Sequence, residues 1–321
     1  MKPLNLHLLG PLIALVALFI LGALLNPAFL APANLSNVLA RSAFIGLIAV
    51  GMTFVITQGG LDLSVGSMAA FLAGVTIMAM NALVPVIGAH WGTVVLGMAV
   101  ALVGGVVAGA VNGTLITRAR IEAFIVTLGT MGIFRSLVTW LADGGTLSLD
   151  SALRAIYRPV YFGGIGWITW PIIVFAIVAV LGEWTMRHTR FGRHVEAIGS
   201  NDRVARYSGV DVERVRLMTY VLLGALVGLA TILYVPRLGS ASGSTGVLWE
   251  LEAIAAVIIG GTALKGGTGR VWGTVVGVLI LSMIDNILNL ADLVSPYLNG
   301  AIQGVIIVLA VVLQREKRAA E

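Results

Sequence analysis

The sequence has no cysteine and very little charge. Without a thiol, the chain can form neither a disulfide framework nor a thiolate metal or redox site. Only 11% of its 321 residues are charged, whereas 58% are hydrophobic and the mean hydropathy is +1.00. No water-exposed surface tolerates such a composition, so the chain belongs in a lipid bilayer and has no room for a large soluble domain.

Strict alternation of polar and apolar residues, which marks a membrane β-barrel, is also missing, because the apolar runs are continuous. The 40 glycines instead favour closely packed membrane helices. We therefore expect an all-α polytopic membrane protein in which residues 1–321 form a single transmembrane domain. The apolar runs predict about ten spans, at 8–26, 38–58, 64–81, 93–116, 122–142, 171–187, 216–236, 250–264, 271–291 and 299–314.

Three places need a further interpretation. The run at 250–264 is short, and only residues 58–63 separate the second span from the third, so a broken or re-entrant helix is compatible with either place. Residues 1–33 have features of a signal peptide, with Lys2 before an apolar run and a small-residue cleavage pattern at 31–33. The run is too long for that, and more spans follow, so we expect an uncleaved first helix.

Lysine and arginine collect on one side of the predicted spans. If the N-terminus is cytoplasmic, the inside segments are 1–7, 59–63, 117–121, 187–215, 265–270 and 315–321. They hold 14 of the 20 basic residues, and Arg216 directly follows one of them; the exceptions are Arg41, Arg135, Arg154, Arg158 and Arg237. Because positive loops stay in the cytoplasm, this asymmetry predicts that both termini are cytoplasmic. The net charge of +5 then reflects membrane orientation and requires no nucleic-acid partner.

The longest predicted periplasmic loop spans residues 143–170 and is rich in aromatic side chains. It carries Tyr157, Tyr161, Trp167 and Trp170 among glycines. Such a loop could be an interfacial cap or a docking surface, or it could simply lie along the lipid headgroups. The sequence favours neither interpretation.

A shift of 207 residues superposes two copies of one glycine motif. The pattern GG-x5-G-[ST] begins at Gly59 and again at Gly266, and the same shift carries predicted spans 1–4 near spans 7–10. This predicts a parallel internal repeat. Asp62, after the first pair, could cap the next helix through backbone N–H groups, which we prefer to a transport role. Glycine permits a positive φ, so we expect structural turns at Gly59, Gly60, Gly66, Gly266, Gly267 and Gly273.

The longest predicted cytoplasmic loop, residues 188–214, contains the signals of a short helix. Ser200 or Asn201 can cap it, Asp202 lies in its first turn and Gly209 ends it. A helix of two turns is not stable alone, so other contacts must hold it. Its face could insert into a groove on another protein or lie on anionic headgroups, and the spacing favours neither. That face combines Val204, Tyr207 and Ser208 with flanking Arg203 and Arg206.

Three motifs in order resemble one known family. The stretch AVGMTFVI at 49–56, running into GGLDLSVGS at 59–67, resembles the signature of ribose and galactofuranose type permease subunits of bacterial ABC importers. HTRFG at 188–192 with AIGSN at 197–201 is similar to the cytoplasmic loop of that family, and residues 250–262 are similar to its eighth span. The resemblance covers roughly residues 40–315, with departures at Ser200 and Lys265, where relatives commonly carry other residues.

This resemblance implies the permease fold of an ABC importer for a monosaccharide, in the bacterial inner membrane. Its partners would be a second permease subunit, two cytoplasmic ATPase subunits and a periplasmic sugar-binding protein. The chain has no G-x-x-x-x-G-K-[ST] motif, so ATP and Mg would be bound by the partner subunits and no cofactor by this chain. The short helix would be the coupling helix that contacts the ATPase, through Gly199, Ser200, Asn201, Asp202, Arg203, Ala205, Arg206 and Gly209.

Polar residues inside spans usually face the bundle interior or a water-filled path. Asp285 and Asn289 are four residues apart and share a helix face, so we place them in the path. For Asn112 and Gln303 we prefer hydrogen bonds between helices. Arg135 is expected to pair with an acid such as Asp285 or to extend outward. The candidates for the translocation path are Asn112, Arg135, Asp285, Asn286, Asn289 and Gln303, with Glu250 and Glu252 at the outer mouth of the eighth span.

An ion-coupled secondary transporter of a small polar solute is the alternative function. Such a carrier usually keeps charged residues near the membrane midplane, and this chain offers few. The four histidines lie singly, so we expect no metal site. No cluster with catalytic spacing suggests an enzyme.

Overall fold

The computed structural model describes residues 6–291, 298, 301–302 and 304–305, and the described chain is mostly helical. Within this part, seven helices are long and apolar enough to cross a membrane, and the stretch Gly10–Leu25 of α1 (Leu6–Leu25) adds a shorter apolar helical segment. The seven are α2 (Pro32–Thr57), α3 (Val65–Ile87), α4 (Trp91–Thr117), α5 (Ala123–Leu141), α8 (Trp170–His188), α11 (Val212–Leu238) and α13 (Val271–Ala291).

Two of the predicted spans do not appear as such. The run at 250–264 forms only α12 (Trp249–Ile259), which rises about 16 Å and is too short to cross the hydrocarbon. The expectation of a full span there is wrong, and the alternative of a broken element holds. Most of the predicted span at 299–314, with Gln303, lies outside the described residues.

Helices α2 and α11 form the centre of the bundle, and most of their residues are buried. Glycine explains how closely α11 approaches α4. A Cβ at Gly105 or Gly109 of α4 would overlap main-chain carbonyl oxygens of α11, and Gly224 and Gly228 of α11 meet α4 in the same way. Because these four residues have no side chain, the two backbones are in direct contact. This is the packing that the glycine content predicts.

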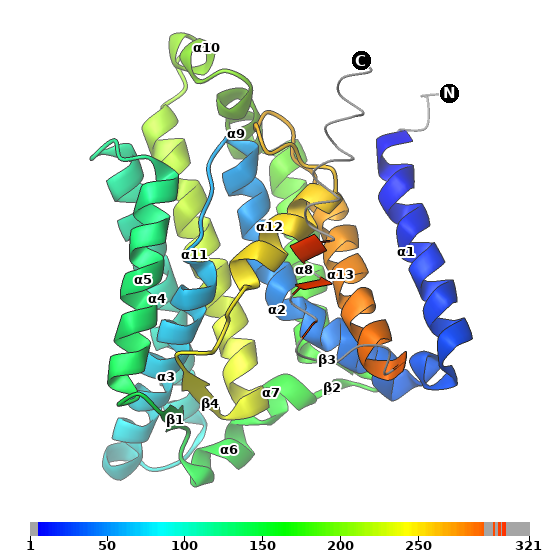
Figure 1. Ribbon diagram of the computed structural model, residues 1–321. Helices are drawn as coiled ribbons and strands as arrows, with labels where there is room; N and C mark the ends of the chain where they lie inside the picture. The colour runs from blue at the N-terminus through cyan, green and yellow to red at the C-terminus, as the bar shows by residue number, and fades with distance from the viewer. Residues whose placement is uncertain (1–5, 292–297, 299–300, 303, 306–321) are drawn as a thin grey trace.

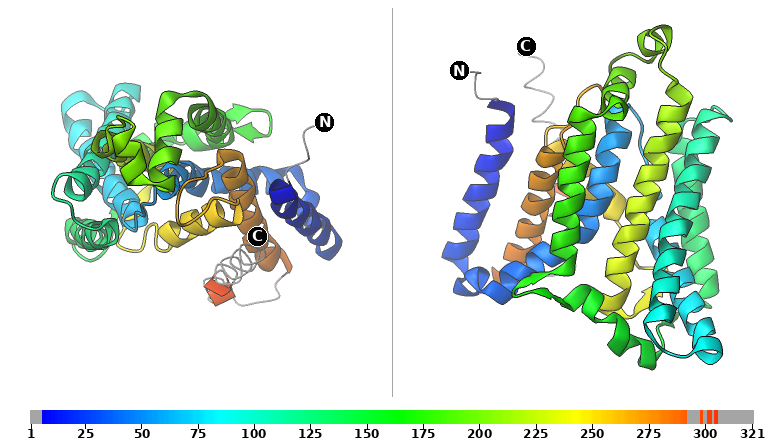
Figure 2. Two further views of the ribbon diagram at one scale, coloured as in Figure 1. Left: turned by 90° about the horizontal axis from the view of Figure 1, so that it is seen from above. Right: turned by 180° about the vertical axis from the view of Figure 1, so that it is seen from behind.

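The two ends of the bundle differ in structure (Figure 1; Figure 2). One end, which we call the α10 end, carries α9 (Arg190–Ser200) and α10 (Asp202–Tyr207). The opposite end, which we call the α6 end, carries short elements. These are η1 (Pro27–Leu30), β1 (Thr146–Ser148), α6 (Ser151–Tyr157), α7 (Pro159–Phe162), β2 (Gly164–Ile165), β3 (Ile168–Thr169) and β4 (Ser240–Ser242). Strand β1 pairs antiparallel with β4, and β2 pairs antiparallel with β3.

The four aromatic residues of loop 143–170 divide into an exposed pair and a buried pair. Trp167 and Trp170 are about half exposed. Tyr157 and Tyr161 are instead buried, and the Tyr157 hydroxyl donates to the carbonyl oxygen of Ile232 at 2.8 Å. The phenols therefore fix α6 and α7 onto the bundle and are not part of an outer surface.

Two non-helical segments enter the bundle from opposite ends. Residues 58–64 descend from the α10 end to the start of α3, and residues 239–248 rise from the α6 end to the start of α12 (Figure 1). From their meeting point α3 runs toward the α6 end and α12 toward the α10 end. Gly66 and Gly246 touch there through their backbones, because a Cβ on Gly66 would overlap the Gly246 carbonyl oxygen.

Candidate functional site

Glycines from three distant segments meet at the α10 end of the bundle. The N–H of Gly267 donates to the carbonyl oxygen of Thr57, the last residue of α2, at 2.8 Å. Gly199 of α9 fits against the same place, since a Cβ there would overlap Thr57 O and Gly267 N. A Cβ on Gly266 would lie 2.9 Å from the N of Gly59. We call this contact of Thr57, Gly59, Gly199, Gly266 and Gly267 the glycine junction.

The predicted turns have the backbone conformation that requires glycine. Gly59, Gly266 and Gly267 have φ values of 86°, 84° and 91°, in the region that L side chains rarely adopt. Gly66 and Gly273 serve a different purpose, because each packs its Cα against a carbonyl oxygen of a neighbouring segment. Gly60 has no positive φ, and its missing side chain leaves room for the hydroxyl of Tyr220.

The predicted short helix is present as α10. The carboxamide oxygen of Asn201 accepts from the N–H groups of Arg203 and Val204 at 3.1 Å each, so Asn201 and not Ser200 is the N-cap. Tyr207 is 92% exposed and Val204 is 57% exposed, so an apolar face has no partner among the described residues. Two ion pairs, Asp202 with Arg216 at 3.7 Å and Arg206 with Glu213 at 3.8 Å, tie α10 to α11.

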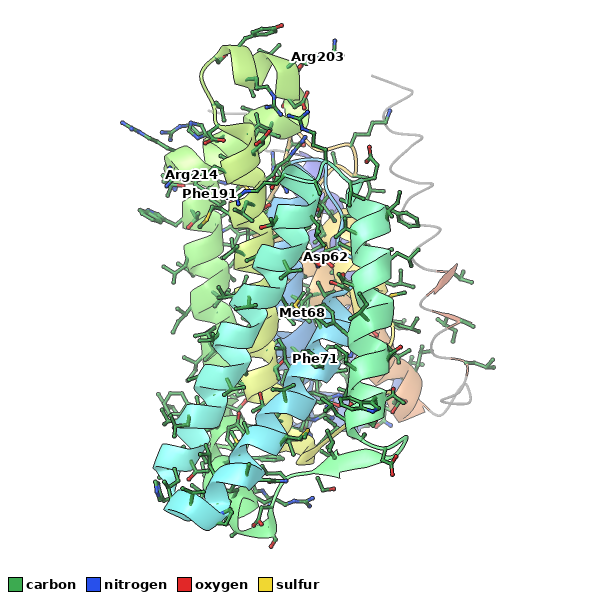
Figure 3. All side chains as sticks on the ribbon, turned by 90° about the vertical axis from the view of Figure 1, so that its left-hand side faces the viewer. Asp62, Met68, Phe71, Phe191, Arg203 and Arg214 are labelled. Atoms are coloured by element: carbon green, nitrogen blue, oxygen red, sulfur yellow. The ribbon has the colours of Figure 1, made fainter. Side chains whose placement is uncertain are left out.

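Two of the residues predicted to couple to an ATPase, Gly199 and Ala205, do not face outward. Gly199 lies inside the glycine junction, and the methyl group of Ala205 is buried beneath α10. Ser200 ends α9, where its hydroxyl donates to the Glu196 carbonyl oxygen at 2.9 Å. Arg203 extends at the tip of the molecule (Figure 3). The surface available to a partner is therefore smaller than the set of predicted residues, because Gly199 and Ala205 face the interior.

Helix α9 connects α10 to the glycine junction. Its buried face consists of Gly192, Val195 and Ile198, and Thr189 caps its start by accepting from the Gly192 N–H. Burial raises the pKa of the Glu196 carboxyl on this helix, while a backbone hydrogen bond from Gly269 and the charges of nearby arginines lower it. The helix is thus packed on the 260–270 loop as well as on α2.

Asp62 is buried in the interior and accepts hydrogen bonds from two neighbours (Figure 3). Its Oδ1 accepts from the backbone N–H and the hydroxyl of Ser64, at 2.8 and 2.6 Å. Its Oδ2 accepts from Nδ2 of Asn112 on α4 at 3.2 Å. The prediction that Asp62 caps α3 is therefore only half right, because it stabilises the N-cap residue Ser64 and not the first-turn N–H groups. The bond from Asn112 joins α4 to the non-helical segment before α3, and not one helix to another as we preferred.

Arg135 of α5 binds main-chain oxygens of the non-helical segment before α12. Its Nη1 donates to the carbonyl oxygen of Gly243 at 2.8 Å and to that of Thr245. The acid whose charge acts on this guanidinium is Glu250, and not Asp285 as we expected. The carboxylate of Glu250 in turn reaches Gly66 in the first turn of α3. Arg135 thus fixes the segment before α12, and Glu250 lies where the two non-helical segments meet.

A polar cavity of about 360 Å³ opens in the half of the bundle nearer the α6 end. Arg41 and Arg237 contribute two positive charges, while Glu252 and Asp285 contribute two negative charges. Aromatic side chains cover one side. The rings of Phe44 and Trp249 stack at 6.3 Å, those of Phe44 and Tyr161 at 5.7 Å, and the guanidinium of Arg237 lies 6.0 Å from the Phe44 ring centre.

The remaining path candidates on α13 separate in the structure. Asp285 and Asn286 line the polar cavity, where Asn286 and Asn34 exchange two hydrogen bonds of 2.9 and 3.0 Å. Asn289 is exposed, and its amide donates to the Asp285 carbonyl oxygen at 2.7 Å. The shared face of Asp285 and Asn289 therefore does not put both into the cavity. Gln303 lies outside the described residues.

Comparison with known proteins identifies this architecture. A family model described as the permease component of branched-chain amino acid transport systems matches residues 34–311. The chain belongs to this permease family. The permease is 40% identical to the ribose import permease protein RbsC of Bacillus subtilis, over 97% of this chain and 94% of that protein. It is 37% identical to RbsC of Escherichia coli, over 96% and 93%.

More distant relatives of the permease carry other names. The xylose transport system permease protein XylH of Haemophilus influenzae is 31% identical, over 97% of this chain and 96% of that protein. A solved ABC transporter in an inward-facing conformation covers 98% of the permease and is itself covered over 97%, with a TM-score of 0.47 and 14% identity. That similarity is too weak for comparing the two structures element by element.

The permease is therefore the transmembrane subunit of an ABC importer, as the resemblance predicted, and not an enzyme. This membership decides against the ion-coupled secondary transporter. It also makes the chain a multi-pass protein of the bacterial inner membrane. Among the described residues, no group of three His, Asp or Glu side chains could hold a metal ion.

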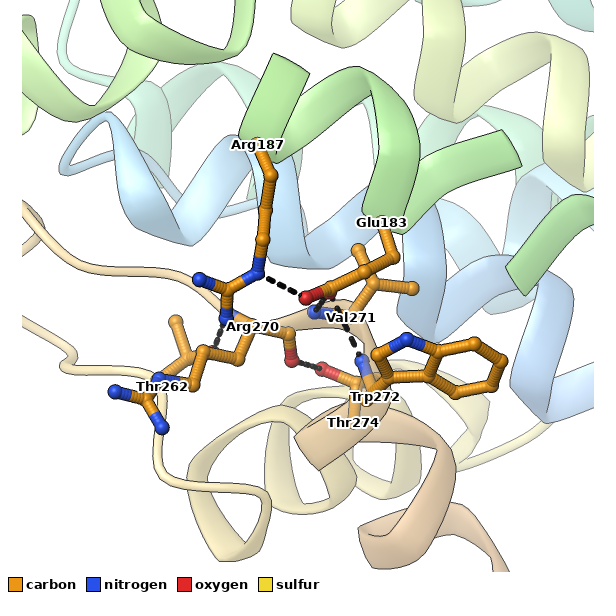
Figure 4. A network of polar contacts seen from close by, with 7 residues as sticks. All are labelled: Glu183, Arg187, Thr262, Arg270, Val271, Trp272 and Thr274. Atoms are coloured by element: carbon orange, nitrogen blue, oxygen red, sulfur yellow. Dashed lines mark hydrogen bonds and ion pairs between the residues drawn. The ribbon is translucent and has the colours of Figure 1, made fainter. Parts of the chain in front are cut away.

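One hydrogen-bond network in the permease was not predicted from the sequence. Glu183 of α8 is buried, and its Oε2 accepts from the N–H groups of Val271 and Trp272, at 2.8 and 3.2 Å, at the start of α13 (Figure 4). Its Oε1 accepts from Nε of Arg187. A carboxylate from one helix thus caps another, which satisfies orphan N–H groups and complements the helix dipole. The available signal was an acid inside an apolar run with Arg187 four residues later.

The residues that line the polar cavity were also only partly predicted. Arg41 and Arg237 were visible as exceptions to the positive-inside pattern, which marked them as residues with a local role. Trp249 and Asn34 gave no such signal. Their placement depends on how α2, α11 and α12 pack, which the sequence pattern does not specify.

Proposed function

We propose that the permease imports a monosaccharide that a periplasmic binding protein delivers. The observation that carries this proposal is the similarity to ribose import permeases along almost the whole of both chains. The wording of the family description makes a branched-chain amino acid the competing solute. The two classes differ in charge, since the amino acid is a zwitterion and the sugar is neutral.

The polar cavity supports a neutral, hydroxyl-rich solute. Its two positive and two negative side chains cancel, and its Asn34 and Asn286 amides supply both donors and acceptors. Trp249, which is half-buried and stacked on the buried Phe44, offers a flat apolar surface to the C–H face of a sugar ring. The volume of about 360 Å³ lies within the range of about 300–1,000 Å³ typical of small-molecule sites. A weak site is sufficient where a binding protein supplies the solute.

The α10 end of the bundle is the cytoplasmic end in this proposal. Most of the basic residues lie on segments that the structure places there, including α9, α10 and the 260–270 loop. Positive segments remain in the cytoplasm. The polar cavity then opens toward the periplasm, and the N-terminus is cytoplasmic. The C-terminus, which lies outside the described residues, belongs on the same side.

The permease couples to ATP hydrolysis through α10. Two ATPase subunits, which bind ATP and Mg, would each seat the exposed Val204 and Tyr207 of one permease in a groove. The ion pairs to α11 and the glycine junction then transmit a displacement of α10 to α2 and α13. A second permease subunit, either a copy or a sister chain, completes the importer.

The permease contains a duplicated unit, in which α12 enters the membrane without crossing it. A shift of 207 residues pairs α3 with α13 and the second half of α2 with α12. The paired elements run in the same direction, which is what a parallel repeat requires (Figure 1). Gly66 and Gly273 correspond, and each lies against a carbonyl oxygen of a neighbouring segment.

Uptake into proteoliposomes tests the proposal. The permease is reconstituted with its co-purifying ATPase, and its binding protein is added on the outside. ATP enclosed in the lumen should drive uptake of labelled ribose or another monosaccharide and not of leucine. Leucine uptake without any monosaccharide uptake, or uptake driven by an ion gradient in the absence of ATP, would contradict it.

A further inference from the structure

Residues 243–248 form non-helical backbone deep within the bundle. Gly246 touches Gly66, and α3 continues from there to Ile87, about 30 Å at 1.5 Å per residue. The segment also lies beside α5, where Arg135 binds the carbonyl oxygens of Gly243 and Thr245. These contacts place it at a depth where the neighbouring helices cross the hydrocarbon.

Within the part of the chain that the structure describes, one side of this segment is exposed. Val247 is 52% exposed, Leu248 is 38% exposed, and Ser244 is exposed as well. Non-helical backbone cannot face lipid, because its polar groups have no partner in hydrocarbon. The exposed side must therefore face either another protein or water.

Polar surroundings favour water. A second cavity of about 430 Å³ lies against the segment and is lined by Ser240, Ser242, Ser244 and Thr245. It shares Arg237 and Trp249 with the polar cavity, so the two are neighbours. The hydroxyls of Ser242 and Ser244 are 2.9 Å apart, and the Ser242 N–H donates to the Thr245 hydroxyl at 3.1 Å. Such a cluster of small hydroxyls suits a hydrated wall and not an apolar protein interface.

We infer that the segment 243–248 lines the water-filled translocation path, with Ser244 and Val247 facing its water at the depth where α3 and α12 begin. This inference rests on the proposed importer function and adds to it the element that the solute passes. Arg135 and Glu250 act behind the segment as positioning residues. The two small cavities are then successive parts of one path from the periplasmic side.

Because the sequence has no cysteine, single cysteines test the inference directly. Ser244→Cys and Val247→Cys are introduced into the assembled importer, and a charged, membrane-impermeant methanethiosulfonate reagent is added from the periplasmic side. Both thiols should react, and solute uptake should fall at least about tenfold, because a charged adduct obstructs a narrow path. The matched control is Val103→Cys on α4, a 61% exposed apolar residue on a regular helix, which should not react.

Two results would overturn the inference. In the first, Ser244→Cys and Val247→Cys react no faster than Val103→Cys. A disulfide between two permease chains would then show that a second copy covers the segment. The other is complete labelling with undiminished uptake. Labelling is measured without any solute, so a wrong solute class would appear only as failed sugar uptake. Size-exclusion profiles that match the unsubstituted importer confirm that each variant is assembled.

Discussion

At the scale of single residues, the buried carboxylate of Glu183 is the side chain whose loss the structure makes most costly. It is the acceptor for two main-chain N–H groups at the start of α13, and it also receives a hydrogen bond from Arg187. Leaving a buried donor without a partner costs about 1–3 kcal/mol. One side chain thus holds α8 to α13 at the α10 end of the bundle.

We predict that Glu183→Ala lowers the thermal stability of the purified permease strongly, by about 1–3 kcal/mol for the unpaired N–H groups. Glu183→Gln should lose much less, because its carbonyl oxygen can still accept from Val271 and Trp272. Thermal unfolding in detergent measures both variants. Glu122→Ala, which removes an exposed acid that makes no cap, is the control and should leave the midpoint unchanged. Equal loss in the Ala and Gln variants would contradict the capping role.

At the scale of elements, α10 is small but its exposed face is well defined. Asn201 starts it, Gly209 with φ of 82° follows it, and ion pairs to Arg216 and Glu213 hold it in place. Exposed ion pairs of this kind contribute about 0–1 kcal/mol each. The position of α10 therefore depends more on its backbone link to α9 than on these charges.

We predict that Tyr207→Ala weakens the contact between the permease and the ATPase without unfolding the permease. The side chain is 92% exposed, so its removal leaves no cavity, but it takes away the largest apolar group available to an ATPase groove. Solute-stimulated ATP hydrolysis and uptake in proteoliposomes should both fall, with unchanged thermal stability. Trp91→Ala, an exposed aromatic at the other end of the bundle, provides the control. Wild-type rates in Tyr207→Ala would remove α10 from the docking surface.

Sequence patterns identified most elements where local signals are strong. Cap and stop residues predicted α10, and long apolar runs predicted α2, α4 and α11 to within a few residues. Helix α9 was missed because its apolar positions, Gly192, Val195 and Ile198, are sparse among charges. The apolar run at 250–264 looked like a span, yet a left-handed Leu248 precedes α12 and a left-handed Gly261 follows it. Hydropathy cannot detect such breaks, because they depend on backbone conformation.

At the scale of the whole molecule, the proposed orientation rests on the uneven distribution of charge. Arg203 lies at the tip of the α10 end, and Asp150 caps α6 at the opposite end. The positive-inside rule assigns the first to the cytoplasm and the second to the periplasm. The two ends are thus distinguishable by a chemical probe.

We predict that Arg203→Cys and Asp150→Cys react from opposite sides of the membrane. A membrane-impermeant maleimide should label Asp150→Cys in intact spheroplasts and Arg203→Cys only after permeabilisation, since the unsubstituted chain has no thiol. Denatured samples of both variants control for expression. Labelling of Arg203→Cys in intact spheroplasts would reverse the proposed topology.

The candidate site was predictable in its parts but not in its assembly. The sequence marked Asp62, Asn112, Arg135 and Glu250 as polar residues within apolar surroundings. It could not show that Arg135 binds the carbonyl oxygens of the segment before α12, since that contact joins residues more than 100 positions apart. Close backbone contacts have no side-chain signature beyond glycine itself, and glycine is abundant throughout this chain.

The glycine junction has a consequence for conformational entropy. Its contacts are made by main-chain atoms of Gly199, Gly266 and Gly267 against Thr57, so no rotamer-rich side chain takes part. Glycine has no side-chain entropy to lose, whereas ordering a long side chain costs up to about 2 kcal/mol. A contact made by backbone atoms therefore keeps one register at low entropic cost, and it connects α9 closely to α2 and the 260–270 loop.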